Sequence, residues 1–183
     1  MIQKEQRIGV FVDVQNLYYS ARHLYNTKVN FKEVLKEAVR GRKLIRAIAY
    51  AVKAESKDEE TFYSALENIG FEVKLKTLQV YYSGLKKGDW DIGIAMDAIE
   101  LAPKLDVIVL ISGDGDFLPL VEHLKRALGC KVEILAFGKS CSSKLVEGAD
   151  EFTDLDNKNF LIARERYKKK YEPSENTPNS QAA

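Results

Sequence analysis

DVIVLISGDGDF, residues 106–117, is the stretch of the chain that decides its fold. The aliphatic run from Val107 to Ile111 is typical of a strand buried on both faces, as in the centre of a parallel sheet. Two glycines then permit a tight turn, and Asp116 is predicted to cap the following helix. The carboxylates of Asp114 and Asp116 are therefore expected at the carboxyl end of a central strand, which is the edge where open α/β sheets bind ligands.

A single Asp in such a turn is often no more than a helix cap. Two Asp residues with a Ser and two Gly in one turn favour a ligand site instead. Like charges held this close repel each other, so such a pair usually has a cation between its members or a raised pKa. The interpretation therefore depends on whether other acids reach the same edge.

The order of strand, acid and helix occurs again near the N-terminus. An apolar run begins at Arg7 and ends at Asp13, and apolar residues then recur at helical spacing from Leu17 to Tyr25. Further strands are predicted at 44–52, 71–82, 131–137 and 152–155, and further helices between 30 and 41 and at 56–69, 91–102, 118–128 and 140–148. The segment 71–82 alternates as an edge strand would, with Lys74 and Lys76 on its solvent face. This alternation of strands and helices predicts a three-layer α/β/α sandwich with a mainly parallel central sheet.

Composition indicates one globular domain of 183 residues, with 45% hydrophobic and 30% charged residues. We expect the domain to span residues 1–162 and a basic, then polar tail to follow at 163–183, predicted to be disordered. No apolar run approaches the ~18 residues of a membrane span, so we expect a cytoplasmic protein without a membrane partner. The net charge of +1 excludes a bulk polycation, and the two cysteines lack metal-site spacing.

Further acids are expected near the same sheet edge, on the helix that begins at Asp91. Asp91 and Asp97 are six residues apart, about 240° around a helix, so they do not share a face. They flank one site only if Asp91 lies in the first turn while Asp97 points inward. Asp97 stands among apolar residues, where an unpaired carboxylate is costly, so it is expected to face a partner. Several carboxylates without His or Cys favour Mg²⁺ or Mn²⁺ over zinc.

Such a site suits metal-assisted hydrolysis of phosphodiester bonds. Basic side chains expected near the same edge are candidates for phosphate contacts: Lys86, Lys87, Lys139 and Lys144. Aromatic side chains that are candidates for base stacking are Tyr18, Tyr19 and Trp90. Taken singly, each of these residues is more often core or solvated surface.

Four segments in order match a known family: 11–16 (FVDVQN), 87–97 (KGDWDIGIAMD), 112–117 (SGDGDF) and 143–152 (SKLVEGADEF). Together they resemble the NYN domain, in its LabA-like (DUF88) branch of the PIN-like nuclease group, over about residues 7–160. The resemblance implies a PIN-like fold and a ribonuclease that uses Mg²⁺ or Mn²⁺. The acidic positions of the family fall on Asp13, Asp91, Asp97, Asp114 and Asp116, and its supporting polar positions on Asn16 and Ser112.

Within this set, the metal ligands are expected to be Asp13, Asp91, Asp97 and Asp114, with Lys86 and Lys87 at the substrate. One departure is the segment from Gly88 to Asp91, which is one residue longer than the usual lysine, glycine, x, aspartate spacing. Asp89 and Asp91 therefore remain alternative ligands.

Other readings of the acids are weaker. A haloacid-dehalogenase phosphatase needs a second acid two residues after Asp13, where this chain has Gln15, and a Toprim site expects Glu in place of Asp13. The serious rival is an NYN domain that binds RNA or regulates without cleaving it. The expected partner is single-stranded RNA, and a homodimer stays open as a further expectation.

Overall fold

One parallel sheet forms the centre of the molecule. The computed structural model describes residues 3–53, 57–77, 79–80, 86–87 and 89–163. Six strands lie in the order β3-β2-β1-β6-β7-β8, and every neighbouring pair is parallel. Their bounds are β1 (Arg7–Asp13), β2 (Lys43–Lys53), β3 (Glu72–Thr77), β6 (Val107–Ile111), β7 (Lys131–Ala136) and β8 (Glu151–Asp154). The predicted parallel sheet is confirmed.

The strand order reverses between β1 and β6. From β1 the chain builds outward through β2 to β3, and after β6 it builds in the other direction through β7 to β8. β1 and β6 pair directly, with Val12 opposite Ile111, and all five residues of β6 are buried. Ligands of open α/β sheets bind at such a reversal, outside the carboxyl ends of the strands. Asp13 ends β1 at that point.

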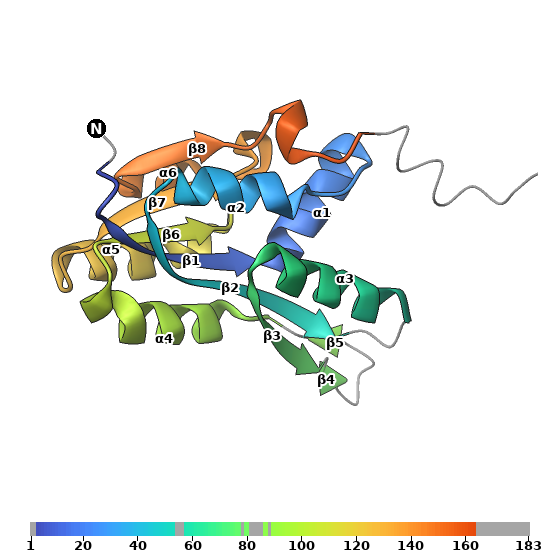
Figure 1. The fold of residues 1–183 in the computed structure, drawn as a ribbon, viewed down its shortest axis with the longest axis horizontal. Helices are drawn as coiled ribbons and strands as arrows, with labels where there is room; N and C mark the ends of the chain where they lie inside the picture. Colours follow the sequence, from blue (N-terminus) through green and yellow to red (C-terminus); the bar gives the residue numbers. More distant parts are fainter. Residues whose placement is uncertain (1–2, 54–56, 78, 81–85, 88, 164–183) are drawn as a thin grey trace, which may run out of the picture.

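Helices cover both faces of the sheet (Figure 1). One face packs against α1 (Val14–Tyr25), α2 (Phe31–Val39) and α3 (Lys57–Ile69). The other packs against α4 (Asp91–Leu101), α5 (Leu118–Arg126) and α6 (Ser143–Gly148). Alternate residues of β1 divide between the two cores, Val10 and Val12 on the first and Phe11 on the second, as the strand period of two requires. The predicted three layers are present.

The single strand predicted at 71–82 is wrong. β3 ends at Thr77, and Gln79–Val80 forms a separate strand, β4, that pairs antiparallel with β5 (Lys86–Lys87). On the face of β3 expected to meet solvent, Lys76 is exposed and lies over the Trp90 ring, whereas Lys74 is half-buried and bonds to Asp97 of α4. Long Lys side chains pack their stems while their ammonium groups find partners, so their polarity misleads a strand pattern.

A buried ion network joins the two halves of the sheet away from the carboxyl edge. The side chains of Arg42 and Glu133 are each 1% exposed and share two hydrogen bonds of 2.8 Å. Arg40 donates to Glu133 and Glu151, and Lys131 bridges the same two carboxylates. Although burial raises the pKa of Glu133, the bonds from Arg42 and Lys131 lower it below its ordinary value.

The last described segment closes over the connection between α1 and α2. The Asn30 N–H donates to the carbonyl of Phe160 (2.8 Å), the Ile162 N–H donates to Lys28 (2.8 Å), and the Thr27 hydroxyl donates to Ile162 (2.6 Å). Residues up to Ile162 are therefore part of the folded unit. Among the described helices, none combines the length and apolar character needed to cross a membrane.

Candidate active site at the carboxyl edge of the sheet

Asp13 is held rigidly where β1 passes into α1. It is the N-cap residue of the helix, and its Oδ1 accepts a hydrogen bond from the Asn16 N–H at 3.0 Å. This is the local chemistry of an Asp that precedes a helix, because the first N–H groups of a helix have no partner within it. Its other oxygen, Oδ2, accepts from the Ser112 hydroxyl at 3.2 Å. Both carboxylate oxygens are thus oriented by the protein.

The loop after β6 is joined to the start of α1 by a second contact. The Gly113 N–H donates to Asn16 Oδ1 at 2.9 Å, and the Asp114 N–H donates to the Ser112 hydroxyl at 3.3 Å. A Cβ at Gly113 would lie 3.1 Å from the Cα of Cys141, which explains why a glycine stands there. Asn16 and Ser112, predicted at the site, therefore fix the two acid-bearing loops against each other.

Asp114 caps the turn after β6, where the sequence pattern assigned that role to Asp116. Its Oδ1 accepts from the Asp116 N–H at 3.0 Å and so begins the short 3₁₀ helix η2 (Gly115–Phe117). The helix α5 then starts at Leu118, with Pro119 in its first turn. Asp114 is half-buried, whereas Asp116 is exposed.

The environment of Asp13 disfavours its charge. Burial, with a smaller contribution from the charges of Asp91 and Asp114, raises the pKa of the Asp13 carboxyl to about 6, although the bonds from Asn16 and Ser112 oppose the rise. The structure thus brings Asp91 and Asp114 each within electrostatic reach of Asp13. A carboxylate that is desolvated beside other carboxylates is typical of a functional site.

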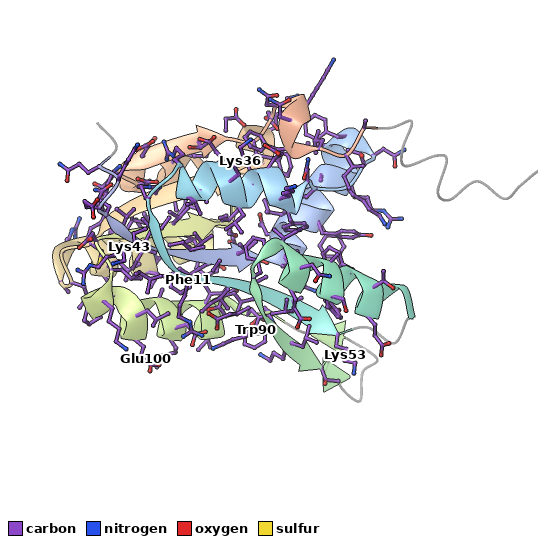
Figure 2. All side chains as sticks on the ribbon, viewed as in Figure 1. Phe11, Lys36, Lys43, Lys53, Trp90 and Glu100 are labelled. Carbon is purple, nitrogen blue, oxygen red and sulfur yellow. The ribbon has the colours of Figure 1, made fainter. Side chains whose placement is uncertain are left out.

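Asp91 is the first residue of α4, and Trp90 fixes that helix end. The Trp90 indole N–H donates to the Ala51 carbonyl at 2.9 Å, and its ring packs edge-on against Tyr50 at 5.3 Å. A Cβ on Gly93 would lie 2.5 Å from the ring, so this glycine makes room for Trp90. Figure 2 shows Trp90 beside the start of α4. Of the two candidate acids, Asp91 contributes through its charge to the raised pKa of Asp13. The backbone carbonyl of Asp89 accepts a hydrogen bond from the Lys76 ammonium at 3.0 Å.

Asp97 bonds to side chains of β2 and β3. Its Oδ2 accepts from both Lys74 Nζ and the Tyr50 hydroxyl, each at 2.6 Å. Although burial raises the pKa of Asp97, these two bonds lower it below its ordinary value. Asp97 therefore faces a partner, as expected, and that partner is Lys74 together with Tyr50. Sequence reasoning missed both, because Lys74 was assigned to a solvent face and Tyr50 to an apolar strand.

The side chains of Lys86 and Lys87 lie outside the described part of the structure, although their backbone forms β5. Lys139 lies 5.1 Å from the centre of the Tyr25 ring, at the carboxyl end of β7.

The sequence profile of the NYN domain matches residues 7–156, most of the chain and all the strands of the sheet. The chain belongs to the NYN domain family. NYN domains are in general nuclease-like proteins of the PIN-like group.

Three other proteins are similar to this chain. "Low amplitude and bright protein LabA" of Synechococcus elongatus is 26% identical over 182 residues, covering 91% of this chain and 93% of its own. "Uncharacterized protein MJ0482" of Methanocaldococcus jannaschii is 29% identical over 171 residues, covering 91% of this chain and 62% of its own. The crystal structure of VPA0982, a protein of unknown function from Vibrio parahaemolyticus, is 36% identical, covers 88% of this chain and 99% of its own, and has a TM-score of 0.82.

The donor set of this NYN domain suits a hard divalent cation. Carboxylates, an amide and a hydroxyl gather at the site, and all offer oxygen. Within the described residues, no three or more His, Cys, Asp or Glu side chains are grouped closely enough to hold a metal by themselves. Mg²⁺ fits such an arrangement, because it is commonly bound through one or two carboxylates, with water and substrate phosphate completing its shell.

Proposed function

We propose that this NYN domain is a metal-dependent ribonuclease that hydrolyses phosphodiester bonds of RNA with Mg²⁺ or Mn²⁺. The observation that supports it best is the half-buried, oriented carboxylate of Asp13, which lies within electrostatic reach of Asp91 and Asp114 at the strand-order reversal. Three acids at such an edge repel both one another and an incoming phosphate, and a divalent cation relieves that repulsion.

Each residue has a distinct part in this proposal. Asp13, Asp91 and Asp114 hold the cation, which when bound would lower the pKa of a water and neutralise charge on the phosphate. Asn16 and Ser112 keep the two acid-bearing loops in register, so they are positioning residues. Asp116 is the exposed acid at the rim. We assign Asp97 to holding α4 against β3, because Lys74 and Tyr50 both bond to it.

The alternative is an NYN domain that binds RNA without cleaving it. The observation in its favour is that the described residues contain no ready group of three metal-binding side chains. In addition, the name of the LabA relative, "Low amplitude and bright protein LabA", mentions no chemical reaction.

The deciding experiment substitutes Asp114→Asn. Asn has the shape of Asp and also caps turns, so η2 should be kept while the charge is lost. We expect cleavage of a labelled single-stranded RNA in Mn²⁺ to fall by at least about 100-fold, while RNA affinity measured in chelator stays equal or rises. The matched control is Glu122→Gln on α5, an exposed carboxylate away from the site, which should cleave as wild type does.

Cleavage that survives both the substitution and the chelator would show a contaminating nuclease. Absence of cleavage by the wild type on several RNAs, with binding intact, would favour the binding module.

A further inference from the structure

Tyr19 is an aromatic side chain left open to solvent on α1. It is 62% exposed, and it is the one aromatic residue among the exposed large hydrophobic side chains of the described part of the chain. A single exposed apolar side chain is ordinary in a folded protein. The contact of Tyr19 with Tyr18, and its position on α1 near the acid site, distinguish it from an ordinary exposed side chain.

The ring of Tyr19 is held by its neighbour. Tyr18 packs edge-on against it, with ring centroids 5.5 Å apart and planes at 76°. Arg22 donates to the Tyr18 hydroxyl at 2.9 Å and so holds that second ring in turn. An aromatic ring already held in one orientation loses little conformational entropy when a partner stacks on it. The pair is therefore a preorganised surface.

Tyr19 also lies beside the acid site. It follows Asn16 by three residues, and residues at that spacing are neighbours on a helix surface, with about 5–6 Å between their Cβ atoms. Asn16 is bonded to Gly113 in the loop that carries Asp114. Tyr19 is thus about one helical turn from the loops that hold the carboxylates.

α1 carries no acid of its own that would repel a polyanion. Its sequence, VQNLYYSARHLY, contains no Asp or Glu, and Arg22 and His23 stand in its last turn. The first turn of a helix usually favours acidic residues, yet here the cap Asp13 is the single acid. A nucleic-acid backbone that reaches the acids along α1 therefore meets no further negative side chain of this helix.

We propose that α1 is a binding surface for single-stranded RNA, in which Tyr19 stacks on an unpaired base next to the bond held at the acids. This inference rests on the proposed ribonuclease function and adds the helix and the side chain that would hold a base of the substrate. Base stacking on an aromatic ring is tolerant of sequence, because every base has a π face. The bases of a duplex are already stacked on one another, so double-stranded RNA cannot use Tyr19.

The test is binding of a short single-stranded RNA that carries 2-aminopurine, whose fluorescence falls when the base stacks. It is done in chelator, so that no cleavage occurs, with the full chain as wild type, Tyr19→Phe and Tyr19→Ala. We expect Tyr19→Phe to bind and quench as wild type does. Tyr19→Ala should bind about 5- to 150-fold more weakly and lose the quenching at saturation. A duplex of the same sequence should bind all three equally.

The matched control is Met96→Ala on α4, because Met96 has the same 62% exposure as Tyr19 but lies on another helix. It should leave RNA binding unchanged. Equal binding and quenching by Tyr19→Ala and wild type would overturn the proposal. The proposal would also be overturned if Tyr19→Ala changed only the sedimentation coefficient, lowering it. That result would mean that Tyr19 lies in a contact between copies of the chain.

The outcome is separable from that of the ribonuclease proposal. Stacking is read without metal and without turnover, whereas the Asp114→Asn assay reads cleavage. If the wild type quenches the fluorescence but never cleaves RNA, the stacking proposal stands and the ribonuclease proposal is wrong. If the wild type cleaves RNA but its quenching does not depend on Tyr19, the ribonuclease proposal stands and the stacking proposal is wrong.

Discussion

Asp13 has two roles with opposite effects on the stability of the fold. As an N-cap it stabilises α1, and as a half-buried acid near Asp91 and Asp114 it carries a charge that the fold disfavours. Residues in such unfavourable environments are typical of functional sites, where the arrangement that the chemistry needs lowers the stability of the fold. The cost should be visible in the pH dependence of unfolding.

The first prediction concerns Asp13→Asn. The pKa of Asp13 is about 6 when folded, against 3.8 ordinarily, so the folded state binds the proton more tightly. Wild-type stability should therefore fall as pH rises from about 4 to 6, by up to about 3 kcal/mol. Asp13→Asn should lack this fall and be more stable than wild type at pH 7.5. Urea unfolding in chelator measures both proteins.

The pH range matters for this comparison. The Arg7 bonds lower the pKa of Asp106 to about 2, and those of Lys131 and Arg40 lower that of Glu151 to about 2. These two acids lose their stabilising charge as pH falls toward 2, so measurements should stay above pH 4. Equal slopes for wild type and Asp13→Asn would contradict the assignment. Adding Mn²⁺ at pH 7.5 should stabilise wild type more than the variant.

The sequence pattern predicted which residues meet at the site better than what each one does there. Asp13 and Asp114 were expected together because parallel strands share one carboxyl edge, with Asp91 and Asp97 on a helix beside it. In the structure Asp97 bonds to Lys74 and Tyr50. The cap was assigned to Asp116 instead of Asp114, since sequence alone does not tell where a turn of glycines ends and a helix begins.

At the scale of elements, α4 shows why some contacts were not predictable. The helix is apolar on nearly all sides, so its periodicity does not tell which face meets the sheet. Only the placement of β3 at the sheet edge brings Lys74 onto Asp97. In the same way, the break after β3 depends on pairing between β4 and β5, which no local pattern encodes.

The second prediction tests what Asp97 does. If Asp97 holds α4 against β3, Lys74→Met and Asp97→Asn should act alike, because they remove the two sides of one contact. Each should lower the free energy of unfolding by about 1 kcal/mol, since both groups are partly exposed. Each should also lower RNA cleavage by a similar, modest factor, without changing the Mn²⁺ concentration that gives half-maximal rate.

Melting curves and Mn²⁺ titrations of the two variants provide the measurement, with Lys36→Met on α2 as the control for loss of an exposed lysine. If Asp97→Asn alone abolished cleavage and raised the Mn²⁺ requirement, Asp97 would be the metal ligand that the family resemblance implies.

At the scale of the whole molecule, the chemistry and the buried ion network are separated. The acids gather at the carboxyl edge, whereas Arg42 and Glu133 lie buried near the other end of the strands. Arg42 comes just before β2, and Glu133 lies in β7 on the other side of the reversal. The network therefore ties together the two halves between which the candidate site opens.

The third prediction concerns the end of the chain. A protein that ends at Ala163 keeps the bonds of Phe160 and Ile162 to the α1–α2 connection, so it should melt at the wild-type temperature. A protein that ends at Leu155 loses them and should melt clearly earlier. Thermal unfolding of the three chains gives the comparison. A shorter chain ending at Ala163 that fails to fold would contradict the domain limit expected from composition.

RNA binding by the same proteins tests the tail separately. Residues 163–183 hold five Lys or Arg and three Glu. Their loss should weaken binding most at low salt, because backbone contacts release counterions. Equal affinity at every salt concentration would remove the tail from the binding surface.

The central place of β1 has a consequence for how the protein is made. β1 leaves the ribosome before β2 and β6 and can pair with β2 early, but its other edge pairs with β6, which begins at Val107. At about 5–20 residues per second, that edge stays open for on the order of ten seconds during synthesis. An unpaired, apolar strand edge attracts other chains. The nascent chain is therefore most exposed to aggregation in this interval, and ribosome-associated chaperones would have to shield it until β6 arrives.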